Sequence, residues 1–153
     1  MNLAYTVCII AVACLTFDKA ISAPEHQAAP ARTCFVKIGA TPKRPCRFVY
    51  SIQVPKLRQM VVGAKTADGD FSFSGPMVDR RSFRVSEIYA GGPLKASGRC
   101  SLTRTAKGRV STIDCWAKSE LGIASMKSTA DRPDNWDLTI NRIVPNSSSD
   151  KKH

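Results

Sequence analysis

Histidine, the usual general base, and a free cysteine, the usual thiol nucleophile, are both expected to be missing from the middle of this sequence. The 153 residues include two histidines, His26 and His153, and both lie outside the segment 34–144 that we expect to fold. That segment also holds four cysteines, which we expect to be paired in disulfides and so to lack a free thiol. It contains no Cys-x-x-Cys spacing of the kind that favours zinc. We therefore expect a protein that is not an enzyme, with no metal site and no cofactor.

Two arrangements of charged and hydroxyl side chains are weak candidates for catalysis. Asp68 and Asp70 flank a glycine, where carboxylates commonly stabilise a turn rather than act as an acid–base pair. Lys118 precedes Ser119, but adjacent residues of a strand point to opposite faces, which separates the amine from the hydroxyl. A hydrolase or nuclease is thus the least favoured function.

Positive charge is the most pronounced chemical feature of the chain. The formal net charge is +11, and the basic residues gather in two stretches without any acidic residue. An excess of this kind favours association with polyanions. The first stretch, between His26 and Ala67, contains Arg32, Lys37, Lys43, Arg44, Arg47, Lys56, Arg58 and Lys65, and the second contains Lys95, Arg99, Arg104, Lys107 and Arg109.

Arginine side chains in these stretches can hold a carboxylate or phosphate through two parallel hydrogen bonds. Strand alternation places Trp116 on the face opposite Cys115, either exposed among charges or covered by another strand. If the two basic hairpins lie on the same side, their turns form one positive surface. The predicted anion-binding residues are Lys43, Arg44, Arg47, Arg99, Arg104, Lys107, Arg109 and Trp116.

We expect a binding module whose partner is an anionic cell-envelope polymer, lipid headgroups at a membrane surface, or an acidic protein. Nucleic acid is a further polyanion, which the sequence does not specifically indicate. The alternative function is inhibition of a protease or lysozyme-type hydrolase by rigid loops, with Gly91-Gly92-Pro93 and Pro42-Lys43-Arg44-Pro45 as the candidates. The charge has a plainer interpretation as well, a solvated surface that keeps the protein soluble.

The beginning of the chain predicts export. Met1–Phe17 is apolar and carries no charged side chain, and small residues follow up to Ala23, so residues 1–23 are typical of a cleaved signal peptide. We therefore expect a secreted or periplasmic protein without a transmembrane segment after processing. Two alternatives stay open: a buried N-terminal strand or helix, and lipid anchoring through Cys14, since Ala11-Val12-Ala13-Cys14 resembles a lipobox.

Removal of this leader leaves Cys34, Cys46, Cys100 and Cys115, and an oxidising compartment favours two disulfides. Cys34 and Cys46 lie at equal distances from Ala40, and Cys100 and Cys115 lie at equal distances from the turn at Lys107-Gly108. Because a hairpin places such residues opposite each other, we predict the bridges Cys34–Cys46 and Cys100–Cys115 among the three connectivities.

Short runs of β-branched and aromatic residues, separated by turn signals, predict the elements that carry these residues. We expect an all-β antiparallel meander of eight or nine short strands, closed as a barrel or packed as a sandwich, in one domain over 34–144. Residues 24–33 are expected as a flexible Ala/Pro lead-in, 75–81 as a helical turn and 145–153 as a disordered polar tail. The predicted strands are 34–38, 46–54, 57–64, 70–74, 82–89, 95–104, 109–118, 121–126 and 136–143. The predicted core residues are Phe48, Tyr50, Ile52, Phe71, Phe73, Phe83, Val85, Cys100, Leu102, Ile113, Cys115 and Ala117.

Overall fold

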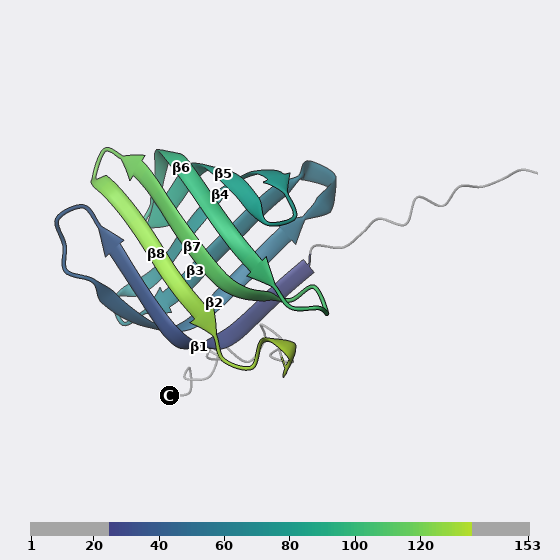
Figure 1. Ribbon diagram of the computed structural model, residues 1–153. Helices are drawn as coiled ribbons and strands as arrows, with labels where there is room; N and C mark the ends of the chain where they lie inside the picture. The colour runs from purple at the N-terminus through teal and green to yellow at the C-terminus, as the bar shows by residue number, and fades with distance from the viewer. Residues whose placement is uncertain (1–24, 136–153) are drawn as a thin grey trace, which may run out of the picture.

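The computed structural model describes residues 25–135, which form a closed barrel of eight antiparallel strands (Figure 1). Each strand pairs with the next one along the chain, and the last pairs with the first. The strands are β1(Glu25–Ile38), β2(Arg44–Val54), β3(Gln59–Thr66), β4(Gly69–Asp79), β5(Ser82–Ala90), β6(Pro93–Arg104), β7(Val110–Ser119) and β8(Gly122–Ala130), with the short 3₁₀ turns η1(Pro55–Leu57) and η2(Pro133–Asn135). The predicted all-β meander is confirmed, as a barrel.

Several predictions fall outside the described residues. These are the signal peptide over 1–23, the strand over 136–143 and the polar tail over 145–153. Within residues 25–135, no helix is long and apolar enough to cross a membrane.

Strand β1 closes the barrel and corrects the prediction of a flexible lead-in. Its first half, from Glu25 to Pro30, pairs with β2, and its second half, from Ala31 to Ile38, pairs with β8, while Phe35 and Val36 in this half also pair with β2. Figure 1 shows the strand bending between these halves. Alanine and proline weaken the local strand signal, but a closing barrel supplies partners on both sides. Pro30 lies where the register shifts, a position at which the missing N–H is tolerated.

The predicted core faces are confirmed on most strands and wrong on β2. Val49 and Ser51 are buried on β2, whereas Phe48, Tyr50 and Ile52 are only half-buried. The reason is a register shift between Cys46 and Phe48, because one extra residue in a strand reverses the alternation beyond it. The predicted core residues that are buried are Phe71, Phe73, Phe83, Val85, Cys100, Leu102, Ile113, Cys115 and Ala117.

The helical turn predicted over 75–81 is also wrong, because β4 continues to Asp79. Gly75 lets β4 run close to β5, since a Cβ there would collide with the carbonyl oxygen of Arg84. The chain then turns at Arg80 and Arg81, and the Asp79 carboxylate accepts the backbone N–H of Arg81 at 2.6 Å.

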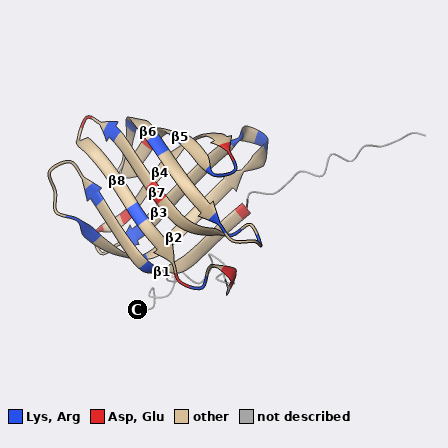
Figure 2. Ribbon diagram, viewed as in Figure 1, with Lys and Arg blue, Asp and Glu red and all other residues tan. Residues whose placement is uncertain are grey.

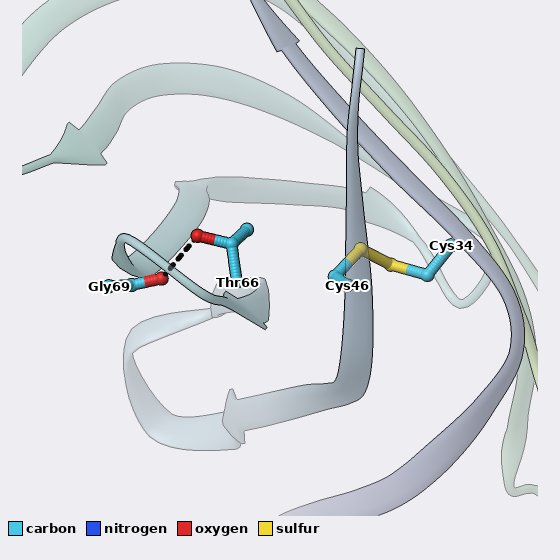
Figure 3. Close-up of a disulfide and its surroundings, with 4 residues drawn as sticks. All are labelled: Cys34, Cys46, Thr66 and Gly69. Atoms are coloured by element: carbon cyan, nitrogen blue, oxygen red, sulfur yellow. Dashed lines mark hydrogen bonds between the residues drawn. A yellow bond between two sulfur atoms is a disulfide. The ribbon is translucent and has the colours of Figure 1, made fainter.

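Both predicted disulfides are confirmed. Cys34–Cys46 joins β1 to β2 with the Cα atoms 5.1 Å apart, and Cys100–Cys115 joins β6 to β7 with a Cα separation of 4.1 Å. The first bridge lies near the β3–β4 turn, in which the Thr66 hydroxyl donates to the carbonyl of Gly69 at 2.9 Å (Figure 3). All four cysteines are buried. Together with Phe73, Phe83, Met60 and Met126 they fill an interior of the size that eight strands enclose.

Candidate basic and aromatic surfaces

The meander places the two basic hairpins at opposite ends of the barrel. Consecutive hairpin turns alternate between ends, so the β1–β2, β3–β4, β5–β6 and β7–β8 turns share one end, the four-turn end. The β2–β3, β4–β5 and β6–β7 turns share the other, the three-turn end. The turn of the first basic hairpin and that of the second therefore do not form one surface (Figure 1). Seven of the eight predicted anion-binding residues lie in three groups, at the two ends and on the outer wall, and Arg47 lies apart from them on β2.

At the four-turn end, Arg44 is already engaged by a carboxylate. Its Nη1 lies 2.8 Å from Asp68 Oδ2, and both side chains are well exposed, so the pair contributes little to stability but offsets one charge. Lys43 lies in the β1–β2 turn and is exposed. Arg44 and Gly91 line one shallow hollow there, so the two loops predicted for enzyme inhibition lie at the same end.

The outer wall over β1, β8, β7, β6 and β5 carries Trp116 within a row of cations. Lys37, Ser125, Trp116, Arg99 and Arg84 are directly paired from strand to strand. Trp116 is 55% exposed, while its neighbours along the strand, Cys115 and Ala117, are buried, so the indole points outward. With neighbouring strands about 4.8 Å apart, the row spans about 19 Å.

Further apolar side chains are exposed around Trp116. Phe35 on β1 is 49% exposed and Ile123 on β8 is 61% exposed, and Leu121 is exposed in the adjoining β7–β8 turn. A groove of about 380 Å³ lies beside Phe35 and is also lined by Lys37, Lys43 and Lys127. We name this surface the aromatic–basic wall and define it by Phe35, Trp116, Ile123, Lys37, Lys43, Arg84, Arg99, Lys118 and Lys127.

The wall keeps a positive balance. Its acidic neighbour Asp114 lies 3.0 Å from Lys127, and both side chains are exposed. Within residues 25–135 this pair and Arg44–Asp68 are the two side-chain ion pairs. Figure 2 shows basic residues on β1, β6, β7 and β8, on the side of the barrel that faces the viewer. Arg47 is exposed on β2, next to this wall but outside it.

At the three-turn end, the Arg104 side chain links the β4–β5 turn, the β6–β7 turn and β2. Its Nε donates to the carbonyl of Arg80 at 2.9 Å, Nη1 to that of Gly108 at 2.9 Å, and Nη2 to Gln53 Oε1 at 3.2 Å. Burial lowers the pKa of the Arg104 guanidinium from its ordinary value, Glu25 opposes this shift, and Arg80 adds to it. Lys107 is exposed in the β6–β7 turn, and Arg109 is half-buried beside it.

Sequence reasoning missed several residues that the fold brings to these sites. Lys37 belonged to the basic stretch but was not singled out, although pairing through β8 places it in the row of Trp116. Arg80 and Arg81 were assigned to a helical turn. Consecutive hairpin turns lie at alternate ends of a meander, and this rule places the β4–β5 turn at the same end as Arg104. The rule can be applied only when every strand has been predicted correctly.

The position of His26 also differs from the prediction. His26 was expected in a tail, yet it lies in β1, paired with Ile52, with an exposed side chain. In the part of the chain that the structure describes, no three His, Cys, Asp or Glu side chains lie close enough together to hold a metal ion.

Comparisons with known proteins give this chain no relative from which a function could be transferred. The sequence matches no family model and no curated protein, and the barrel matches no solved structure.

Proposed function

We propose that the protein is an exported, non-enzymatic module that binds an anionic membrane surface through the aromatic–basic wall. The observation that carries this proposal is the exposed indole of Trp116 in a row with Lys37, Arg99 and Arg84, beside exposed Phe35 and Ile123. The combination of apolar and cationic groups on one outer surface favours lipid headgroups among the anionic partners.

Apolar and cationic side chains of the wall would contribute to membrane binding in different ways. Trp and Lys are amphipathic, and both are stable at the boundary between apolar and aqueous phases. Each Lys or Arg close to an anionic leaflet contributes roughly 1 kcal/mol of attraction. Ile123 and Phe35 add aliphatic and aromatic surface that a sugar polymer or an acidic protein would contact less completely.

Export is supported by the buried disulfides as well as by the apolar leader. Cys34–Cys46 and Cys100–Cys115 are stable under oxidising conditions, which are found outside the cytosol. We therefore place the function at a secreted or periplasmic location.

The proposal is tested by co-sedimentation of the purified, oxidised protein with lipid vesicles. Vesicles of phosphatidylcholine alone are compared with vesicles that also contain phosphatidylglycerol, at low and near-physiological salt. Trp116→Ala and Ile123→Ser are expected to weaken binding to the anionic vesicles, because they remove the apolar part of the contact. Leu57→Ala is the matched control, since Leu57 is exposed at the three-turn end, away from the wall.

Other anionic partners are outcomes of the same experiment. Immobilised acidic polysaccharide and nucleic acid are tested beside the vesicles. Retention on one of these polymers with no binding to phosphatidylglycerol vesicles would contradict the membrane proposal, and so would equal binding by Trp116→Ala and the unmodified protein.

A second candidate function, inhibition of a protease or lysozyme-type hydrolase, is supported by one observation. The loops at 42–45 and 91–93 lie at the same end of the barrel and line a common hollow. Arg44 is paired with Asp68, so Lys43 is the exposed basic side chain that a trypsin-like pocket would take. Titration against trypsin and lysozyme tests this function. A stoichiometric loss of activity that Lys43→Ala abolishes would support it, and full activity at excess protein would exclude it for these enzymes.

A further inference from the structure

The three-turn end holds a guanidinium whose charge is not matched by a carboxylate hydrogen bond. Arg104 makes three hydrogen bonds, and the acceptors are two backbone carbonyls and the side-chain amide of Gln53. These neutral acceptors position the guanidinium but do not neutralise it. A guanidinium carries five N–H donors, so two are left for another acceptor.

The surroundings of Arg104 add further positive charge. Arg80, Arg81 and Arg104 line a basin of about 440 Å³, together with Thr103 and Thr105. Hydrogen bonds hold the β4–β5 turn against β6, because Leu102 donates its N–H to the carbonyl of Arg81 at 2.7 Å and Arg104 donates to that of Arg80. The backbone that carries the two exposed arginines is thus fixed at the edge of the basin.

Three acidic residues lie close to the basin, and two of them accept hydrogen bonds from neutral donors. Asp79 accepts the backbone N–H of Arg81 at 2.6 Å, and Asp134 accepts the hydroxyl of Thr105 at 2.9 Å. Glu25 is the acid whose charge acts on Arg104. None of the three forms a side-chain ion pair with an arginine of the basin in the described part of the chain.

We infer that this basin is a binding site for one tetrahedral oxyanion, a phosphate or sulfate group. The free N–H donors of Arg104 would bind two of its oxygens, and Arg80 and Arg81 would close over the remaining ones. Arginine suits this role because its planar fork matches the spacing of phosphate oxygens. The inference does not rest on membrane binding, since it uses other residues, at one end of the barrel, and a ligand much smaller than a bilayer.

The test is an NMR titration of the ¹⁵N-labelled protein with sodium phosphate, and separately with sodium sulfate, at constant ionic strength set with chloride. We expect a saturable shift of the Arg104 Nε–H resonance and of the backbone amides from Ala106 to Gly108. The double variant Arg80→Ala/Arg81→Ala is expected to bind about tenfold more weakly or worse, because it loses two charge-assisted contacts. Neither arginine side chain makes a hydrogen bond within residues 25–135 that the fold would lose, whereas Arg104 holds the β4–β5 and β6–β7 turns through its own hydrogen bonds.

The control variant Arg32→Ala/Arg47→Ala removes the same charge from exposed positions elsewhere on the barrel and is expected to bind as the unmodified protein does. A glycerol phosphate titration distinguishes the sources of the group: binding equal to that of inorganic phosphate would indicate a phosphate carried on a larger molecule, and exclusion would indicate the free ion. Non-saturating shifts spread over all basic residues, or equal weakening by both variants, would overturn the inference.

Discussion

Reduction of the two disulfides should remove a large part of the stability of this barrel. The bridges close loops with sequence separations of 12 and 15 residues, and these loops do not overlap. In the chain-entropy model each loop of this length contributes about 3 kcal/mol, so the two together contribute about 6 kcal/mol. A domain of this size is typically stable by about 5–15 kcal/mol, so the reduced protein should lie near its unfolding threshold.

Urea denaturation at fixed temperature measures this contribution. The oxidised protein is compared with the same protein in excess reductant, which changes no side-chain volume appreciably. We expect the midpoint to fall strongly and the slope m to rise, because the reduced unfolded chain exposes more surface. The variants Cys34→Ser/Cys46→Ser and Cys100→Ser/Cys115→Ser separate the two bridges, and each should lose about half of the total or somewhat more, since each also buries two hydroxyls.

The control is a comparison of the two double variants with the fully reduced protein. Because the bridges lie in different hairpins, the losses in free energy of unfolding caused by removing each bridge should add up to the loss on full reduction. A change in the free energy of unfolding of less than about 1 kcal/mol on full reduction would refute the reasoning, because the loss of one native disulfide typically costs about 2–5 kcal/mol.

Two further predictions concern close packing and pH. Gly98→Ala should lower the free energy of unfolding by about 1–3 kcal/mol, because the added Cβ would collide with the carbonyl oxygen of Trp116 and with Ala117. Thermal unfolding measures this loss against the control Gly92→Ala, whose added Cβ meets nothing within 4 Å, and equal melting temperatures of the two variants would contradict the packing. Burial raises the pKa of Tyr50, so the folded state keeps its phenolic proton to a higher pH than the unfolded state, whose pKa is near 10. Stability should therefore fall as the pH rises above about 10, and Tyr50→Phe should reduce this loss in denaturation curves recorded from neutral to alkaline pH.

The sequence predicted those features of the fold that depend on local symmetry. Residues at equal distances from a turn face each other in a hairpin, and this argument identified the connectivity of both disulfides. Features that depend on a register shift were not predictable in this way. The irregularity at Arg47 reverses the faces of Phe48 and Tyr50, and no residue type in that segment signals it.

Barrel closure explains the other differences. Residues 25–30 have little strand propensity, and they become a strand because β2 offers an unpaired edge. Barrel closure also explains why the sequence identified Trp116 and Arg99 as candidates but missed Lys37. Lys37 joins their row only because β1 pairs with β8. The basic residues gather into a wall and a basin only when the sheet closes. Their positions along the sequence do not predict this grouping.

The most direct test of membrane binding by the aromatic–basic wall is a comparison of two charge reversals with the same net charge. Lys37→Glu/Arg99→Glu lies on the wall, and Arg47→Glu/Lys65→Glu lies on β2 and β3, outside it. Binding to phosphatidylglycerol vesicles at near-physiological salt is measured for both by co-sedimentation. We predict that the first variant loses binding while the second retains most of it. Equal loss by both would show that net charge alone governs the interaction, and would contradict a specific binding surface.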